Sequence, residues 1–416
     1  LTVWNREPAG SESAMVTVQY NPFIPDVHAN PYPMYARLRE EDPVHWSELM
    51  EAWVLTRYED VVAVLTDSRF SADRRQARNR FADEIARREE EFGPFGRTRT
   101  MLTSDPPEHT RLRRLVSKAF TPRMVEALRP RIQAIVDDLL DSVVDEGRMD
   151  VIADLAYPLP VIVIAEMLGV PPEHRSEFKH WSDEIVGVLG GPLVPEETLQ
   201  RSRVAVHQLA EYLSGVIAER RQEPREDLVS GLIAAEEQGQ ILSEDEMLAT
   251  AMLLLVAGNE TTTNLIGNGM LGLLRDPDQL ERLRADPSLV PVAVEELLRY
   301  DGPVQATGRV AMEDMEIGGR KVTAGQAVIT VLGAANRDPA QFADPDQLDL
   351  ERRPNEHVAF GDGIHFCLGA PLARAEGQIA FETLLRRIGQ PRLASESLQW
   401  GGTFILRGLK GLPIVF

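Results

Sequence analysis

Cysteine is nearly absent from this chain of 416 residues, which contains only Cys367. A single cysteine excludes a disulfide within the chain, and it excludes an iron–sulfur cluster or a four-cysteine zinc site held by this chain alone. The first twenty residues are polar and contain no apolar segment of the kind found in signal peptides. Together these observations predict a protein of the reducing cytoplasm.

Long hydrophobic runs are also missing. The longest are Leu248–Ala257, which Thr250 interrupts, and Leu159–Ala165. Both are far shorter than the roughly 20 apolar residues that cross a bilayer. Positive charge is in the minority, since 44 lysines and arginines stand against 65 aspartates and glutamates, for a net charge of −21. We therefore expect neither a membrane nor a nucleic acid as a partner.

No internal repeat, low-complexity tract or Gly/Ser-rich linker divides the chain. We therefore expect a polar N-terminal segment at residues 1–29 and one large domain over residues 30–416. Apolar residues recur with helical spacing through most of the first half. The helices expected there are Pro31–Glu41, Glu59–Leu65, Pro107–Phe120, Arg123–Asp145, Val161–Leu168 and Thr198–Arg221.

A smaller part of the chain has the alternation and turn residues typical of strands. These segments are Ala52–Arg57, Pro303–Leu332 and Thr403–Phe416. The Arg/Glu-rich stretch Gln76–Thr103 predicts instead a mobile loop or a frayed helix. The fold class expected is mainly α with a smaller β portion, in a single domain.

One helix is expected to be much longer than the others. A capping box at Ser243–Glu246 begins it, and the next proline is Pro277. At 1.5 Å per residue it is roughly 45–50 Å long, and its apolar residues lie nearly all round, which predicts a buried helix. Gly258 in its middle costs about 1 kcal/mol relative to alanine, so a packing or ligand reason is expected.

The single cysteine lies in the segment Phe360–Gly369, which reads FGDGIHFCLG. Gly361 and Gly363 permit a tight turn with positive φ. A helix is expected directly after Cys367, so free backbone N–H groups, those of Leu368 and Gly369, can point at the sulfur and favour the thiolate. A lone cysteine is otherwise most simply a small buried hydrophobe.

The pattern F-G-x-G-x-H-x-C-x-G resembles the haem-binding loop of the cytochrome P-450 superfamily. The resemblance covers the chain from about residue 30 onward and implies the cytochrome P-450 fold, with the long helix crossing one haem b per chain. It also implies that Cys367 is the axial iron ligand, that Phe360 shields the sulfur and that His365 contacts a haem propionate. Gly369 would let the following helix approach the ring.

The stretch Ala257–Thr262 on the long helix resembles the oxygen-activation motif of the same family, with Glu260 where aspartate is more common. The resemblance places Ala257 and Gly258 against the haem. It implies that Thr261 steadies iron-bound dioxygen and that Glu260 relays protons. From the residues alone, the Thr261 hydroxyl is also expected to bond back to the carbonyl of Ala257.

Two further motifs match the family in the right order. Glu296 and Arg299 lie three apart on one helix face and resemble its E-x-x-R ion pair, with Arg352 as third partner. The donors that the resemblance assigns to the haem propionates, besides His365, are His109, Arg113 and Arg309.

The resemblance implies a monooxygenase that inserts one oxygen atom from O2 into a hydrophobic small molecule by hydroxylation or epoxidation, in secondary metabolism. The substrate classes expected are macrolides, terpenoids, steroids and fatty acids, and Gly190–Pro192 is expected to form a flexible lid. Electrons are expected from a separate ferredoxin or flavodoxin with its reductase. Arg114 and Lys118 are expected in the docking patch for that donor.

Three alternatives stay open from the sequence. The first is a peroxide-driven haem-thiolate enzyme, or a non-oxygenating isomerase, on the same scaffold. The second is a haem-binding protein without catalysis. The third is a hydrolase that uses Cys367 and His365, which are two apart in a loop without an evident orienting group.

Overall fold

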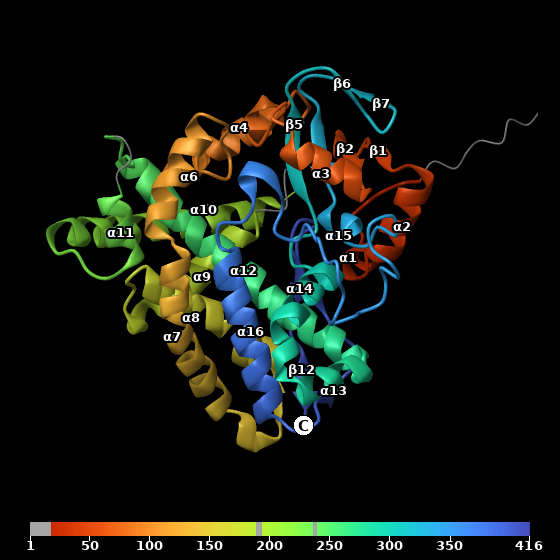
Figure 1. Ribbon diagram of the computed structural model, residues 1–416. Coiled ribbons are helices and arrows are strands. Elements are labelled where there is room, and N and C mark those ends of the chain that lie inside the picture. The colour runs from red at the N-terminus through yellow and green to blue at the C-terminus, as the bar shows by residue number, and fades with distance from the viewer. Residues whose placement is uncertain (1–17, 189–193, 236–238) are drawn as a thin grey trace, which may run out of the picture.

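The computed structural model describes residues 18–188, 194–235 and 239–416. Helices fill most of the molecule, and the largest sheet lies at one end (Figure 1). The α-helices are α1 Pro25–Ala29, α2 Tyr32–Glu41, α3 Tyr58–Thr66, α4 Ala82–Glu91, α5 Gly93–Arg97, α6 Glu108–Ala119, α7 Pro122–Asp141, α8 Pro158–Met167, α9 Arg175–Val186, α10 Glu196–Gln222, α11 Leu228–Ala234, α12 Glu244–Arg275, α13 Pro277–Ala285, α14 Val290–Asp301, α15 Leu332–Ala335 and α16 Ala370–Arg387.

The largest sheet has five strands in the order β1-β2-β8-β5-β3. The parallel pair β2–β8 joins segments far apart in sequence, and the other pairs are antiparallel. Its strands are β1 Val44–Ser47, β2 Ala52–Leu55, β3 Phe70–Ser71, β5 Thr307–Ala311 and β8 Ala327–Thr330.

Small sheets complete the β portion: the pair β6–β7, the pair β10–β11 and the three-stranded β4-β12-β9. Their strands are β4 Arg148–Asp150, β6 Met315–Ile317, β7 Arg320–Val322, β9 Arg392–Leu393, β10 Trp400–Gly402, β11 Arg407–Leu409 and β12 Pro413–Val415. The expectation of a mainly helical fold with a smaller β portion is confirmed.

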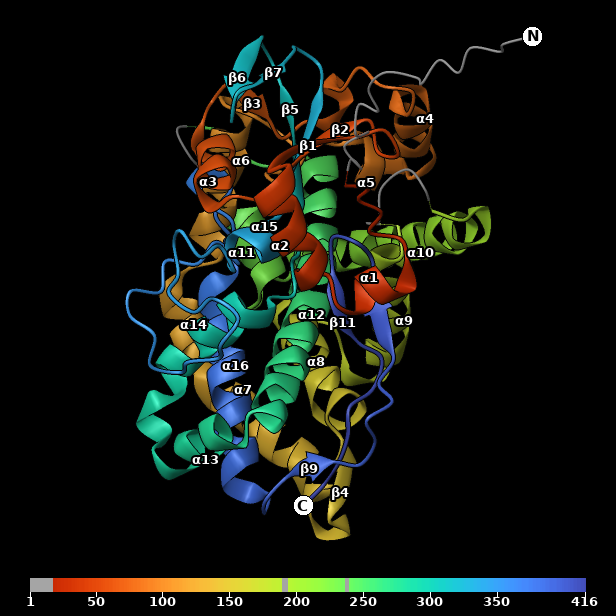
Figure 2. The same ribbon diagram turned by 90° about the vertical axis from the view of Figure 1, so that its right-hand side faces the viewer.

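Helix α12 runs through the middle of the molecule (Figure 2). Both hydrogen bonds of the predicted capping box at Ser243 and Glu246 are present, and the helix has 32 residues, about 48 Å at 1.5 Å per residue. Its neighbours approach very closely at two glycines. A Cβ on Gly267 would lie 2.4 Å from the side chain of Ile152, and one on Gly269 would lie 2.7 Å from the Phe381 ring.

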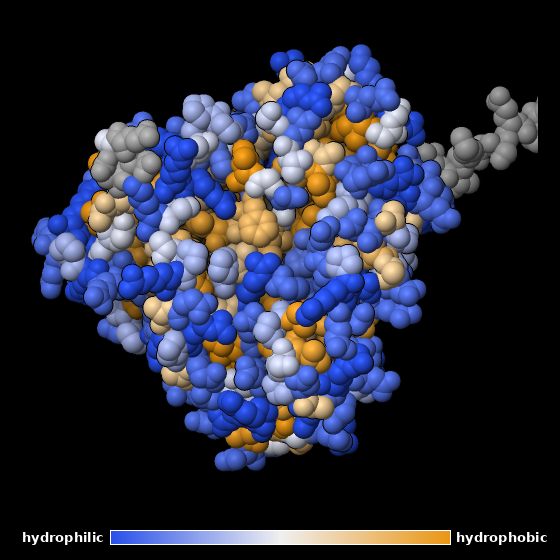
Figure 3. Space-filling model, viewed as in Figure 1, coloured by the Kyte–Doolittle hydropathy of each residue, from blue (hydrophilic) through white to orange (hydrophobic). Residues whose placement is uncertain are grey.

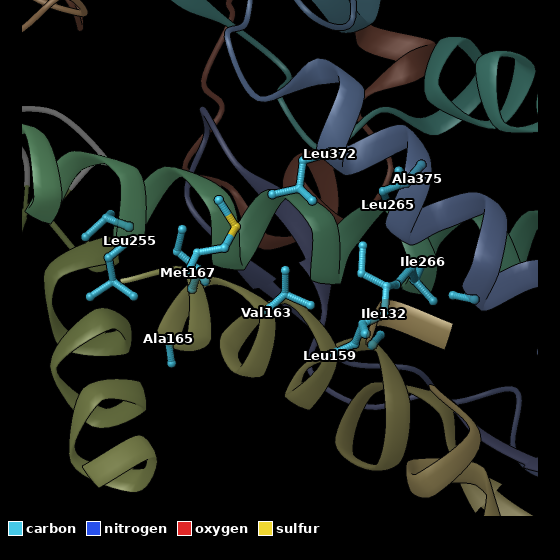
Figure 4. Packing of buried hydrophobic residues seen from close by; sticks show 14 of the residues in the cluster. Ile132, Leu159, Val163, Ala165, Met167, Leu255, Leu265, Ile266, Leu372 and Ala375 are labelled. Carbon is cyan, nitrogen blue, oxygen red and sulfur yellow. The ribbon is translucent and has the colours of Figure 1, made fainter. Parts of the chain in front are cut away.

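Figure 4 shows α12 between α8 and α16, with buried side chains of the three helices pointing toward one another. Leu265 and Ile266 of α12, Leu159 and Val163 of α8 and Leu372 of α16 belong to this core. Burial of each such side chain contributes about 1.5–3 kcal/mol relative to leaving it exposed. The packing fixes α12 against the helix that follows the cysteine.

Most predicted helices are present with ends shifted by a few residues. The stretch Gln76–Thr103, for which a mobile loop or a frayed helix is predicted, is largely helical. It contains α4 and α5, and α4 is held by ion pairs from Glu84 to Arg87 and Arg88. Its Glu91 also pairs with Arg203 of α10 at 2.5 Å. The Arg/Glu richness thus stabilises a helix through contacts, one of which comes from a distant segment.

The N-terminal boundary at residue 29 stays a prediction. Residues 1–17 lie outside the described part of the chain, but Val18 and Tyr20 are buried in one cluster with Tyr35 and Leu38. Helix α1 also lies within this segment. Among the described residues, no helix is both long and apolar enough to cross a membrane.

Candidate active site

The cysteine loop is a series of tight turns. Gly361 and Gly363 have φ values of 72° and 66°, as predicted. The N–H of Phe366 donates to the carbonyl of Gly363 at 3.1 Å, and the N–H of Cys367 donates to the carbonyl of Phe360 at 3.0 Å. A Cβ on Gly363 would lie 2.6 Å from the carbonyl oxygen of Leu65, so the loop passes directly against the end of α3.

The sulfur of Cys367 lies just before helix α16. Burial raises the pKa of its thiol, while the N–H groups of Gly369 and Ala370 and the charges of Arg113 and Arg374 act in the opposite direction. Gly369 is one of the two residues whose amides were expected to point at the sulfur, and Ala370 is an addition to them. The amides that act on the sulfur lie two and three residues beyond it, where the first turn of α16 directs them.

These opposing effects on the pKa of the Cys367 thiol bear on the hydrolase alternative. A nucleophilic cysteine needs a depressed thiol pKa and a base within reach. The pKa of Cys367 is raised, and among the described residues no histidine is hydrogen-bonded to its sulfur. The ring of His365 packs instead against that of His109, with 4.4 Å between centroids. Neither requirement of a nucleophilic cysteine is therefore met among the described residues.

The middle of α12 is open on one face. Ala257 is exposed and Gly258 partly exposed, although the turns on either side are buried. The hydroxyl of Thr261 donates to the carbonyl of Ala257 at 2.8 Å, as predicted. Burial raises the pKa of Glu260, which accepts a hydrogen bond from Nδ2 of Asn264 at 3.3 Å.

Four donors converge from three segments of the chain. His109 and Arg113 come from α6, Arg309 from β5 and His365 from the cysteine loop. His109 is only 3% exposed, yet neither of its ring nitrogens has a hydrogen-bond partner. Burial and the neighbouring Arg309 and His109 lower the pKa of His365 to about 4. Buried donors without acceptors are costly, so this arrangement suits a bound anion.

These observations test whether haem fits the residues. A sulfur ligand, a bare stretch of helix at Gly258 and anion-binding donors are the three features that an iron porphyrin with propionates requires. Apart from the neighbouring backbone of α12, no atom of the described residues lies within 4 Å of where a Cβ on Gly258 would be. Ile364 and Phe366 in the cysteine loop are exposed, at 50% and 39%. Figure 3 shows hydrophobic atoms at the centre of this face, surrounded by hydrophilic ones. The residues fit the group.

The predicted ion pair supports the same loop. Nε of Arg299 lies 2.7 Å from Oε2 of Glu296, and both side chains are fully buried. Arg352 is the third partner, with Nε 3.1 Å from Oε1 of Glu296. Asn355, just before the cysteine loop, donates to the same carboxylate at 3.2 Å. The pair therefore connects α14 to the chain that leads into the cysteine loop.

Sequence reasoning missed the second carboxylate of α14. Glu295 binds Arg374 of α16 through two hydrogen bonds and His357 through a third. It also missed Asn264 and the buried Glu376 of α16. The position of Asn264, one turn after Glu260 on the long helix, was the available signal, while the pairing of Glu295 required the fold.

The side chains that the resemblance to the family places around the substrate pocket are mainly apolar. Phe95, Met101, Val188, Val304 and Ile405 are partly buried and pack on the core. Of the two arginines that the sequence offers as a substrate anchor, Arg97 and Arg99, the second pairs with Asp73 at 2.9 Å. The predicted lid at Gly190–Pro192 lies outside the described residues.

The basic character of α6 is only partly available for docking. Arg111 is hydrogen-bonded to Glu108 of its own helix and to Glu246 of α12. Arg114 and Lys118 are exposed. The patch is thus smaller than the count of arginines in the sequence indicates.

Comparison with known proteins identifies the architecture. The model of the family described as Cytochrome P450 matches residues 45–290 and 288–388. Cytochrome P450 CYP107DY1 of Priestia megaterium is 47% identical over 88% of this chain and 90% of its own, and the monooxygenase PikC of Streptomyces venezuelae is 45% identical over 94% and 92%. The solved structure of cytochrome P450 PksS of Bacillus subtilis 168 has a TM-score of 0.88 at 41% identity, over 95% of this chain and 99% of its own. The chain therefore belongs to the cytochrome P450 family, as its cysteine loop predicts, and it is a cytochrome P450 monooxygenase.

Proposed function

We propose that the chain binds one haem b through Cys367 and inserts one oxygen atom from O2 into an apolar small molecule. The observation that carries the proposal is the buried His109, whose two ring nitrogens have no hydrogen-bond partner, beside the loop that holds the only cysteine of the chain. The family implies the haem cofactor. When bound, the haem supplies the iron at which dioxygen is activated.

The residues of the site would have three tasks, which are to hold the propionates, to supply a proton and to accept a hydrogen bond. The residues that would hold the two propionates are His109, Arg113, Arg309 and His365, and Gly369 lies beside the sulfur, which is 3.8 Å from where its Cβ would be. A carboxylic acid delivers a proton best when its pKa is near the working pH. Burial raises the pKa of Glu260 in that direction.

Thr261 would act as the second polar group on the open face of α12. Its hydroxyl proton is donated to the carbonyl of Ala257, so its oxygen lone pairs remain able to accept a hydrogen bond from water or from a protonated oxygen. Glu260 and Thr261 are adjacent in sequence, which places an acid and a hydroxyl at the same turn of the helix. This pair favours oxygen-driven over peroxide-driven turnover, because peroxide brings both of its oxygens and its electrons.

The substrate we infer is uncharged and hydrophobic, because the partly buried side chains that the resemblance places around the substrate pocket are apolar and Arg99 is already paired. Similar proteins support the classes named above. They include the 6-deoxyerythronolide B hydroxylase of Saccharopolyspora erythraea and the vitamin D(3) 25-hydroxylase of Pseudonocardia autotrophica. Solved relatives contain testosterone and myristic acid. A terpenoid remains a further candidate.

Electrons would come from a separate ferredoxin or flavodoxin with its reductase, docked at the exposed Arg114 and Lys118 of α6, and the site of action would be the cytoplasm. The test of the reaction is isotopic. Turnover with NADH, a ferredoxin system and ¹⁸O2 is expected to place one labelled oxygen atom in each product. Unlabelled product, or equal turnover with hydrogen peroxide alone, would refute it.

A further inference from the structure

A cluster of charged and aromatic groups beside the cysteine loop takes no part in the proposed reaction. Its members are Glu295, His357, Phe360 and Arg374. Arg374 of α16 binds Glu295 of α14 in a fork, with Nε–Oε1 and Nη2–Oε2 distances of 2.7 Å each. The carbon of the same guanidinium lies 4.6 Å from the centre of the Phe360 ring. The carbonyl of Phe360 in turn accepts the hydrogen bond from the N–H of Cys367. One cation therefore joins two helices to the residue that holds the cysteine backbone.

His357 completes the cluster from the loop side. Its Nδ1 accepts the N–H of Ala359 at 3.2 Å, so in the neutral ring the proton is on Nε2, which lies 3.1 Å from Oε2 of Glu295. Burial acts to raise the pKa of Glu295, but hydrogen bonds from Arg374 and His357 outweigh it and lower that pKa to about 2. The carboxylate is thus ionised and holds both partners.

Glu295 and Glu296 have different tasks although they are neighbours on α14. Glu296 binds the fully buried Arg299 and supports the chain before the cysteine loop. Glu295 binds Arg374, whose side chain is 32% exposed and which acts on the sulfur. Of the two arginines, Arg374 contacts the cysteine loop itself, through the Phe360 ring.

We propose that Arg374 is a positioning residue for the sulfur, which fixes the Phe360 ring beside Cys367 and stabilises negative charge there, while Glu295 fixes Arg374 in place. The proposal rests on the proposed role of Cys367 as the axial ligand. A cation near the sulfur favours the more electron-rich state of a metal bound to it, and the partly buried setting strengthens this interaction. Arginine suits the task because its planar fork can pair with a carboxylate and stack on a ring at once.

The reduction potential of the haem-loaded protein tests the proposal. The variants are Arg374→Gln, Glu295→Gln and Arg374→Lys, each measured by spectroelectrochemistry without substrate. Arg386→Gln is the matched control, because Arg386 is exposed on the same helix, about 18 Å further along at 1.5 Å per residue. We expect a more negative potential for Arg374→Gln and one closer to the parent for Arg374→Lys, which keeps the charge. Glu295→Gln removes a negative charge, which raises the potential, and loosens Arg374, which lowers it, so its potential should lie above that of Arg374→Gln.

Two outcomes would overturn the inference. One is a potential for Arg374→Gln equal to that of Arg386→Gln. The other is a shift in Arg374→Lys as large as in Arg374→Gln, which would point to packing rather than charge. If Arg374→Gln does not fold, Arg374→Met takes its place, and a potential equal to that of Arg386→Gln again contradicts the proposal. The carbon monoxide spectrum of the unsubstituted protein is recorded first. Absence of a thiolate signature there refutes the role of Cys367 itself, whereas a normal signature with unshifted potentials refutes only the inference.

Discussion

Asn264 donates a hydrogen bond from Nδ2 to Oε1 of Glu260, one turn back along α12, at 3.3 Å. The amide is held in that position from the other side, because a Cβ on Gly408 of β11 would lie 1.8 Å from its Oδ1. The hydrogen bond opposes burial, which raises the pKa of Glu260. A strand near the C-terminus therefore influences the acid of the proposed proton relay.

Asn264→Ala is expected to raise the pKa of Glu260 further, since the bond to its ionised form is lost. Proton donation by Glu260 requires the protonated acid, so the product formed per NADH falls as pH rises past that pKa. In Asn264→Ala this fall should begin at a higher pH than in the parent. Gly408→Ala, which displaces the Asn264 side chain, should shift the profile in the same direction. A shift to lower pH in either variant would contradict the assigned contact.

The propionate donors are expected to govern retention of the haem. His109→Phe and Arg113→Gln each remove one donor of the cluster. A hydrogen bond to a charged group contributes about 1.5–3 kcal/mol, so haem transfer to apomyoglobin should be roughly 10- to 100-fold faster in each. The control is Arg282→Gln, since Arg282 forms an exposed pair with Glu351. Equal transfer rates in all three variants would show that the cluster does not hold the propionates.

Glu376 of α16 makes stability depend on pH. It is 2% exposed, and burial raises its pKa from 4.5 to about 8, against a hydrogen bond with Thr262. A raised carboxyl pKa means that the folded protein keeps a proton that the unfolded chain releases. This contribution to stability is complete below pH 4.5 and is lost as the pH rises through 8.

Urea unfolding of the parent and of Glu376→Gln at pH 6 and pH 8 measures this effect. Between these values the free energy of unfolding of the parent should fall by about 2 kcal/mol more than that of the variant. The glutamine cannot ionise, so it removes the dependence while it keeps a polar group. An identical fall in both proteins would mean that Glu376 is ionised at pH 6.

Docking of the electron donor is expected to depend on the exposed charges of α6. Reversal at Arg114 and Lys118 together, to glutamate, should raise the KM for a ferredoxin at least several-fold and flatten its salt dependence, because long-range attraction is lost. The same change at Arg386, on another helix, is the control. Unchanged ferredoxin affinity and salt dependence in the double variant would show that Arg114 and Lys118 do not bind the electron donor.

The sequence sufficed for features that local chemistry determines. The capping box at Ser243 and the proline at Pro277 mark both ends of α12, and the glycines of the cysteine loop have the positive φ expected. The ion pair of Glu296 and Arg299 follows from their spacing on one helix face. Each of these depends on residues within a few positions of one another, or on a resemblance carried by a short motif.

Features that depend on distant segments could not be predicted. The parallel pairing of β2 with β8 joins Ala52 to Ala327, and no spacing pattern specifies it. The Arg/Glu-rich stretch Gln76–Thr103 predicts a mobile loop or a frayed helix, and the order of α4 depends in part on a pairing with Arg203 of the distant α10. The grouping of Glu295 and Arg374 likewise appears only when α14 and α16 are placed side by side.

The claim on which the rest depends is that Cys367 is the axial ligand of a bound haem. The most direct measurement is the difference spectrum of the dithionite-reduced protein with carbon monoxide. We predict a strongly red-shifted Soret band, the signature of a thiolate opposite the bound gas, and its loss in Cys367→His. A Soret band at the position typical of imidazole ligation in freshly prepared protein, or a red-shifted band that persists in Cys367→His, would contradict the account.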